Sequence, residues 1–145
     1  MRIASHFRSG ALIAATLALP LAASAGETPS PEGATVYFVD LHDGDTVSNP
    51  VTIHFGLQGM GVAPAGVEWD DTGHHHLIID EAIEGAELNE PIPSDEQHVH
   101  FGGGQTEVTL DLPAGEHTLQ LVMGDQYHIP HEPPVMSERI TVTVQ

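Results

Sequence analysis

The chain of 145 residues has no cysteine, and only three of its residues are Lys or Arg, against 21 Asp and Glu. The absence of cysteine excludes disulfides, zinc–thiolate sites, iron–sulfur clusters, thiol enzymes and blue-copper centres. The shortage of cations argues against a nucleic-acid binder that neutralises phosphates and against docking on anionic lipid. We therefore expect a domain that is not cross-linked by disulfides and that binds neither nucleic acid nor anionic lipid.

The basic residues are unevenly placed, since Arg2 and Arg8 stand at the start of the chain, before an apolar run over residues 11–22. A basic start, a short apolar middle and a small-residue end are typical of a secretory signal. The run is also too short to span a bilayer as a mature helix. We expect residues 1–25 to be a cleaved signal peptide and the protein to be periplasmic or secreted. The mature chain would then carry all 21 acids and a single base, Arg139, for a formal charge of −20.

The rest of the chain is organised as a short polar linker over residues 26–34 and one domain over residues 35–145. Apolar residues alternate in short runs, and Gly and Pro separate the runs, as in β-strands joined by turns. Seven strands are predicted, over residues 35–39, 50–57, 74–80, 97–101, 108–112, 117–123 and 140–144. The pattern favours an all-β fold, a single antiparallel immunoglobulin-like β-sandwich of about seven short strands.

Two of these strands, residues 108–112 and 117–123, are joined through a Pro-Ala-Gly sequence that is typical of a turn. We expect the two strands to pair as a hairpin. The acidic stretch from Glu81 to Glu96 contains two prolines, so we expect an irregular loop there.

The chain is unusually rich in histidine, with eleven residues of this type. His74 and His76 share one face of their strand, as do His98 and His100, because side chains alternate along a strand. If the two strands are neighbours, which the sequence leaves open, four imidazoles converge. Imidazole is a ligand for zinc, copper and nickel where thiolate is absent. Asp80 is in phase with the first pair and is a candidate oxygen ligand or ring-orienting residue.

A second group of histidines, His128 and His131, lies in a predicted loop between Met123 and Met136. Imidazole beside thioether is the donor mixture expected for copper, whereas zinc does not need methionine. We therefore predict a metal site with His74, His76, His98 and His100 as the main ligands. His128 and His131 would close or extend it, and copper is the expected ion, with zinc as the alternative.

Each of these residues also has a structural interpretation. In this structural interpretation, the histidines at residues 74–76 would be an exposed polar start to a strand, and His98 and His100 would form a face that titrates with pH and binds no metal. His117 is expected in the core or at its rim and Met123 in the core, while His42 and His54 are expected at the surface. Met60 lies in a predicted loop, where the sequence decides neither packing nor ligation.

Four segments carry a resemblance to a known family, and they are Thr72–Asp80, His98–Glu107, Gly115–Leu121 and His128–Ser137. On these motifs the chain resembles the domain-of-unknown-function 4399 family of small exported bacterial proteins, from about Thr35 to the C-terminus. The resemblance implies export and assigns no activity.

The sequence His98-Val99-His100, followed by an aromatic residue and glycine, is also similar to the copper-ligand strand of copper–zinc superoxide dismutases. Those enzymes need a disulfide, and this chain has no cysteine for one. The likeness therefore ends at that strand.

The sequence is compatible with three functions. The first is a metal-binding module for storage, buffering or delivery, whose affinity should fall below about pH 6 as protons compete for imidazole. The second is a non-catalytic interaction module with pH-responsive histidines. The third is a metal-dependent enzyme with Glu68, Asp70 or Glu96 as general base. The chain has no nucleophile elbow, phosphate loop or dinucleotide fingerprint, so catalysis is the least favoured of the three.

Overall fold

The computed structural model describes residues 28–145, and the predicted signal peptide lies outside them. The strands are β1 (Thr35–Phe38), β2 (Thr46–Val47), β3 (Val51–Gln58), β4 (Gly61–Val62), β5 (Thr72–Ile79), β6 (His98–His100), β7 (Glu107–Leu110), β8 (Gly115–Gly124) and β9 (Ile140–Val144), and the 3₁₀ helix η1 spans Gly85–Asn89. The prediction of an all-β chain is confirmed, because each of the seven predicted strands coincides with one of these elements. The two-residue strands β2 and β4 were not predicted.

The smaller sheet has three strands in the order β1-β3-β7, all antiparallel. Its central strand β3 buries Val51, Ile53 and Phe55, while Thr52 between them is exposed. This alternation is the period of two that the sequence predicted for a strand with one buried face. The sheet therefore presents one apolar face to the rest of the molecule.

The larger sheet has the order β2-β9-β8-β5-β4, and β6 pairs with β5 beside β4. The long pairings β5–β8 and β8–β9 are antiparallel, but β2–β9 and β4–β5 are parallel. The prediction of a purely antiparallel arrangement is therefore wrong at these two pairings. Each involves a two-residue strand, which is too short to leave a periodic signal in the sequence. The immunoglobulin-like form of the sandwich stays a prediction.

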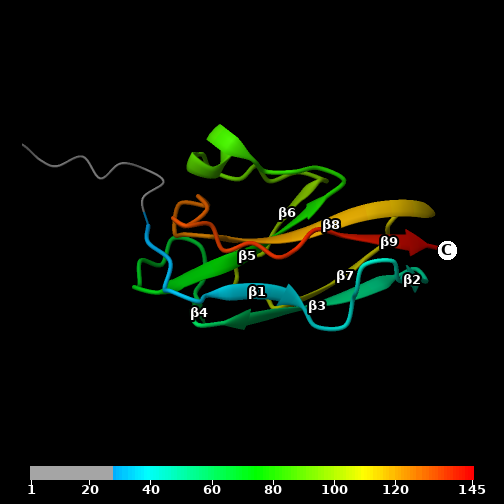
Figure 1. The fold of residues 1–145 in the computed structure, drawn as a ribbon, viewed down its shortest axis with the longest axis horizontal. Coiled ribbons are helices and arrows are strands. Elements are labelled where there is room, and N and C mark those ends of the chain that lie inside the picture. Colours follow the sequence, from blue (N-terminus) through cyan, green and yellow to red (C-terminus); the bar gives the residue numbers. More distant parts are fainter. Residues whose placement is uncertain (1–27) are drawn as a thin grey trace, which may run out of the picture.

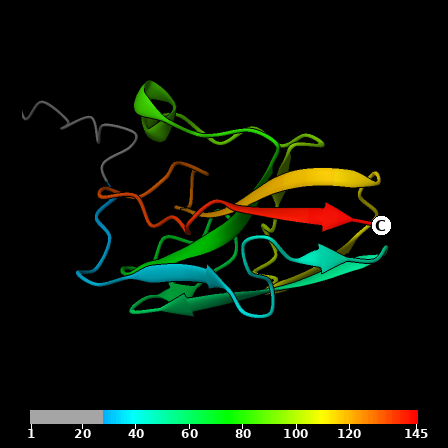
Figure 2. The same ribbon diagram turned by 45° about the vertical axis from the view of Figure 1, so that its right-hand side comes forward.

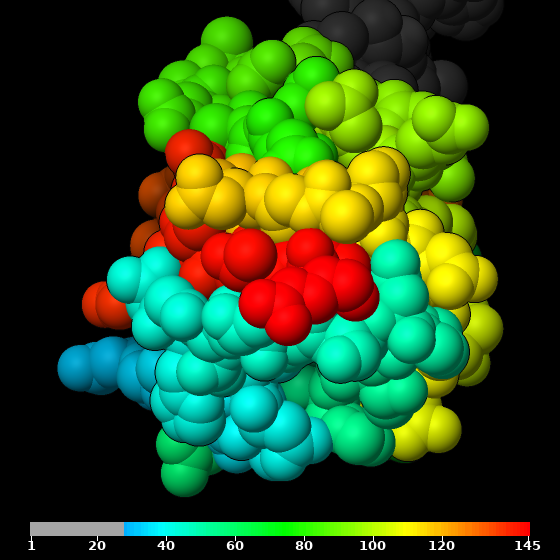
Figure 3. Space-filling view, turned by 90° about the vertical axis from the view of Figure 1, so that its right-hand side faces the viewer, coloured from blue at the N-terminus to red at the C-terminus, as the bar shows by residue number. Residues whose placement is uncertain are grey.

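The two sheets lie as two layers, with β1 and β3 on one side and β5, β8 and β9 on the other (Figures 1 and 2). Side chains of both layers form the main core, among them Ile53, Phe55, Leu77, Leu121 and Met123. Met123 is fully buried, as predicted. At one end of the molecule the C-terminal residues of β9 lie between β8 and the segment of β2, in the order of the sheet (Figure 3).

The predicted hairpin is not formed, because β7 pairs with β3 and β8 pairs with β5 and β9. The segment between β7 and β8 instead carries the chain from one sheet to the other, and Leu112 is buried in the core between them. Two alternating strands joined by a short turn are compatible with either outcome. The prediction of a hairpin was therefore wrong, although both strands were placed correctly.

The outer face of the larger sheet is covered by the segment that was predicted to be an irregular loop. It contains the short helix η1, and Ile83 and Ile92 from this segment pack against Ile78 and Val122 of the sheet. These four residues form a second, smaller apolar cluster. Both faces of β5 are consequently buried.

The described part of the predicted linker is paired with a distant loop. Pro29 bridges to Glu132, and the amide of Glu132 donates a hydrogen bond to the carbonyl of Thr28. No helix among the described residues is long and apolar enough to cross a membrane.

Candidate metal centre

Strand β5 places His74 and His76 on the outer face of the larger sheet, the face that carries Ile78. His75 points to the inner face, where its ring lies 5.2 Å from that of Phe55, measured between centroids. All three histidines of the triplet are fully buried. The interpretation of this triplet as an exposed start to a strand is therefore wrong.

Strand β6 adds His100, which lies directly opposite His76 in the antiparallel pairing. His98 shares the same face, but it lies opposite Ile78, two residues farther along β5. Two residues along a strand correspond to roughly 6.6–6.8 Å, which is too far for a shared ion. The pairing shows that the two strands are neighbours, which the sequence left open, and only one histidine of the β6 pair reaches the pair on β5.

His98 instead contacts carboxylates at the edge of the outer segment. Its Nδ1 lies 2.8 Å from Asp95 Oδ1, and its Nε2 lies 3.7 Å from Glu81 Oε2. The structure therefore corrects the expected placement of His98 among the four converging imidazoles.

His128 takes the remaining position from the loop after β8. Its backbone has a φ of 68°, in the left-handed region, and its carbonyl accepts a hydrogen bond from the amide of Ile92 at 2.9 Å. His128 was predicted to close or extend the site, and the structure brings it beside the histidines of β5 and β6.

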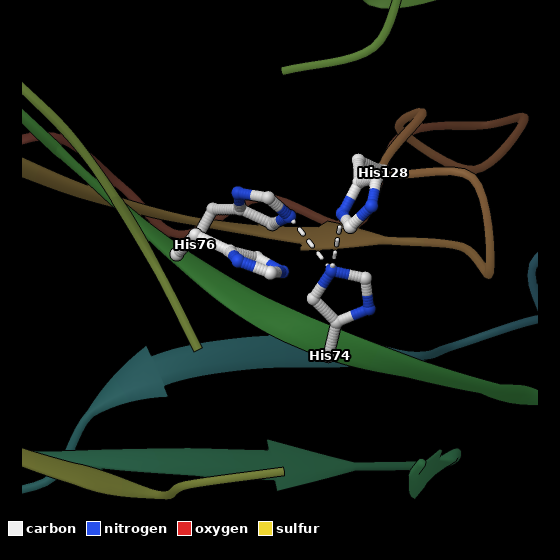
Figure 4. Close-up of side chains that lie close together, drawn as sticks. His74, His76 and His128 are labelled. Atoms are coloured by element: carbon white, nitrogen blue, oxygen red, sulfur yellow. Dashed lines mark hydrogen bonds between the residues drawn. The ribbon is translucent and has the colours of Figure 1, made fainter. Parts of the chain in front are cut away.

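His74, His76, His100 and His128 form one group, and each offers a ring nitrogen within 4.8 Å of those of the others. The Nε2 atom of His74 lies 3.0 Å from Nε2 of His76 and 3.2 Å from Nδ1 of His128 (Figure 4). Four nitrogens at 2.0–2.1 Å from a tetrahedral ion are separated by roughly 3.3–3.4 Å. The two distances from His74 are close to this value, and none in the group exceeds 4.8 Å, so the spacing of the four nitrogens is of the size that one ion needs.

Hydrogen bonding among the rings leaves this group incompletely satisfied. Nε2 of His74 carries either one proton or one lone pair, so it does not make two full hydrogen bonds to His76 and His128. Nε2 of His100 is buried without a partner among the described residues. Convergent nitrogens with unused lone pairs are the donor arrangement that a cation satisfies.

Burial favours the neutral form of three of these imidazoles. Burial, reinforced by repulsion from the neighbouring imidazoles, lowers the pKa of His74 to about 4 and that of His76 to about 2. The pKa of His100 is lowered for the same reasons. The lone pairs of these three rings are therefore free of protons at neutral pH, and proton competition moves below the pH 6 expected from an unperturbed imidazole.

His131 lies apart from the group. It is 1% exposed, and its Nε2 faces the carbonyl of Thr72 at 3.1 Å while its Nδ1 faces that of Met123 at 3.4 Å. The ring therefore joins the His128 loop to the backbone of the sheet. The structure corrects the prediction that this histidine lies beside the candidate ligands.

The three methionines considered as thioether donors lie in the hydrophobic clusters. Met123 belongs to the main core and Met60 packs against it, while Met136 packs against the smaller outer cluster. The mixed imidazole–thioether donor set that favoured copper in the sequence is therefore not what the structure assembles.

The remaining candidates are also accounted for. Asp80 accepts hydrogen bonds from Nδ1 of His117 at 2.7 Å and from the amide of Thr118 at 2.9 Å, so it orients a different histidine. His117 is partly buried at the rim of the core, His54 is partly exposed and His42 is exposed. The three acids proposed as general bases, Glu68, Asp70 and Glu96, are exposed and lie outside the group of four histidines.

Two glycines that the sequence did not single out pack against the rings. A Cβ atom at Gly124 would lie 2.8 Å from Nε2 of His76, and one at Gly102 would lie 2.3 Å from Cε1 of His100. The absence of a side chain at these positions gives the rings the space that they occupy. In the sequence, Gly102 follows the strand of His100 and Gly124 precedes the loop of His128, but glycine at these positions looks like an ordinary end of a strand.

Fold and site together define an all-β protein whose described residues include a buried group of four histidines suited to a metal ion. The chain belongs to the family described as Domain of unknown function (DUF4399), whose sequence model matches residues 53–145. This match confirms the resemblance seen in the motifs, and it covers all four histidines of the group. No curated protein and no solved structure matches the chain.

Proposed function

We propose that this protein is an exported metal-binding module that holds one copper ion through His74, His76, His100 and His128. The observation that carries the proposal is the convergence of four ring nitrogens within 4.8 Å from three separate segments of the chain. Its role would be storage, buffering or delivery of the ion. Export follows from the predicted signal peptide over residues 1–25.

A metal ion accounts for this group better than hydrogen bonding does. Buried polar atoms are nearly always paired, because an unpaired one costs roughly 1–3 kcal/mol. Within the group of four, Nε2 of His100 is nevertheless without a partner in the described part of the chain. Hydrogen-bonded anchoring histidines, by contrast, look like His117 and His131, whose rings face carbonyl or carboxylate oxygens.

Copper is favoured over zinc by affinity rather than by thioether ligands. Nitrogen sites generally bind Cu²⁺ more tightly than Zn²⁺, and four imidazoles suit either ion. Imidazole binds a metal ion in its neutral form, so this ligand set suits either ion. Zinc is therefore expected to bind at the same place with lower affinity.

Titration of the protein with Cu²⁺ and with Zn²⁺, followed by calorimetry, tests the proposal. The wild type should bind one ion, and His100→Gln and His128→Gln should each weaken binding by at least tenfold, since each removes a ligand. His98→Gln is the matched control, because it lies on the same strand as His100 but contacts Asp95 instead. No heat of binding at micromolar protein, or an equal loss in the control, would overturn the proposal.

A further inference from the structure

Asp125 is a buried acid beside the candidate metal site. Asp125 is 1% exposed and lies at the start of the loop that carries His128. An ionised carboxylate in such a position must be compensated by hydrogen bonds or by a nearby cation. Its contacts show what it does for the loop.

One carboxylate oxygen of Asp125 closes the loop around His128. Oδ1 accepts hydrogen bonds from the amide of Tyr127 at 2.8 Å and from the amide of Ile129 at 3.0 Å. The backbone adds two more, from the Asp125 amide to the Ile129 carbonyl and from the His128 amide to the Asp125 carbonyl. The residues on both sides of His128 are thus tied to Asp125, and they hold His128 at its φ of 68°.

The second oxygen of Asp125 is tied to the start of the described chain. Oδ2 accepts a hydrogen bond from the hydroxyl of Thr28 at 2.7 Å. Ser30 extends this attachment, because its amide donates to the carbonyl of Glu132 and its hydroxyl to that of Pro133. The segment of residues 28–30 therefore lies against the His128 loop at the same end of the molecule (Figure 1).

From these contacts we infer that Asp125, held by Thr28, is the positioning residue that keeps His128 aimed at the ion. The inference rests on the proposed function, since it concerns one ligand of that site. Three ligands come from paired strands, whereas His128 comes from a loop whose shape depends on one carboxylate. Residues that orient a metal ligand typically change affinity 10–100-fold when they are removed.

A double-mutant cycle on copper affinity tests this inference. Asp125→Ala should weaken binding by about 10–100-fold, and the double variant with His128→Gln should bind no more weakly than His128→Gln alone. Non-additivity is expected because Asp125 acts through His128. Asp43→Ala is the matched control, since Asp43 also accepts a backbone amide hydrogen bond, from Thr141, but on a different loop. It should leave copper affinity unchanged.

Conservative variants separate positioning from charge. Asp125→Asn keeps an oxygen for the two loop amides, so it should retain affinity to within a few-fold. Thr28→Val removes the hydroxyl donor and should weaken binding several-fold, which also tests the inference if Asp125→Ala does not fold. Additive losses in the cycle, or an Asn variant as weak as the Ala variant, would overturn it.

Failure of the proposed function would be seen separately, in the wild-type titration. Hydrogen exchange of the metal-free protein then reports on the loop alone. Asp125→Ala should accelerate exchange of the Tyr127 and Ile129 amides while leaving those of β5 protected. Unchanged exchange at both amides would overturn the role of Asp125 whether or not metal binds.

Discussion

His74 and His76 differ from His75 only in the face of β5 that they occupy, yet the consequences are opposite. The outer pair meets imidazoles from β6 and from the His128 loop, whereas the inner ring meets Phe55 in the core. Alternation along a strand therefore sorts one run of three identical residues into two candidate ligands and one core residue.

At the same scale, Gly102 should be required for the site rather than for the fold. Gly102→Ala places a Cβ 2.3 Å from Cε1 and 2.6 Å from Nε2 of His100, so this partly exposed ring must move. We expect copper affinity to fall about tenfold or more, with an unchanged circular dichroism spectrum. Gly61→Ala is the control, because its nearest contact is Thr72 Cγ2 at 3.3 Å. Equal affinity in both variants would contradict the packing argument.

His117 should stabilise the protein in a pH-dependent way. Burial lowers its pKa, but hydrogen bonds to Asp80 and to the Pro113 carbonyl outweigh that effect and raise it overall. A raised pKa in the folded state gives stability that is fully present below about pH 6.5 and is lost as the pH rises through the folded pKa. His117→Gln should therefore cost about 1 kcal/mol at pH 5.5 and less at pH 8.5.

Urea unfolding of the His117 variant at the two pH values is the measurement. His42→Gln, in an exposed side chain, should change stability by less than about 0.5 kcal/mol at both. A larger loss of stability at pH 8.5 than at pH 5.5 would contradict the raised pKa of His117 in the folded state.

At the scale of elements, strand positions were predictable from the sequence and strand partners were only partly so. Alternation and turn residues located β3, β8 and β9 because those patterns are local. The hairpin between β7 and β8 was wrong because a turn that stays within a sheet and one that crosses between sheets use the same residues. The two-residue strands β2 and β4 were missed because they are too short to be periodic.

The candidate site was predictable to the same extent. The phase of His74, His76 and His100 follows from strand alternation, but the exclusion of His98 follows from the pairing register of β5 and β6. Register depends on long-range contacts that one sequence does not display. The choice of His128 over His131 depends on the loop that Asp125 shapes, which is again a tertiary property.

The outer segment should contribute to stability as an element in its own right. Ile92 is 6% exposed and packs with Ile78 and Val122, so Ile92→Ala removes buried methylene groups. We expect a loss of about 2–4 kcal/mol in the free energy of unfolding, measured in urea. Val39→Ala, at a side chain that is 48% exposed, should change it by less than about 0.5 kcal/mol. A similar small change for Ile92→Ala would mean that the segment is not packed on the sheet.

At the scale of the whole molecule, the charge is dominated by 21 acids against three basic residues, while the buried histidines set the response to mild acid. Burial lowers the pKa of His74 and of His75 to about 4 and that of His76 to about 2. The unfolded chain binds protons at these positions near pH 6.5, whereas the folded chain does not. Acid therefore favours the unfolded state of the metal-free protein.

The expected result is a fall in stability as the pH is lowered from 7 to 5, where most carboxylates remain ionised. For each of the three buried histidines the slope increases below pH 6.5 toward a limit of about 1.4 kcal/mol per pH unit. Chemical denaturation of the metal-free protein across this range measures the slope. Copper should raise the free energy of unfolding, because it binds the folded state. A flat profile would contradict the neutral, buried state of the three rings.

A crystal structure of the copper-loaded protein tests most directly the claim that four histidines form one metal centre. We predict a single ion bonded to ring nitrogens of His74, His76, His100 and His128 at about 2.0–2.1 Å, the usual metal–imidazole distance. His98 and His131 should keep their present contacts with Asp95 and with the Thr72 carbonyl. An ion bound through His98, through His131 or through surface carboxylates, with the four central rings unligated, would contradict the claim.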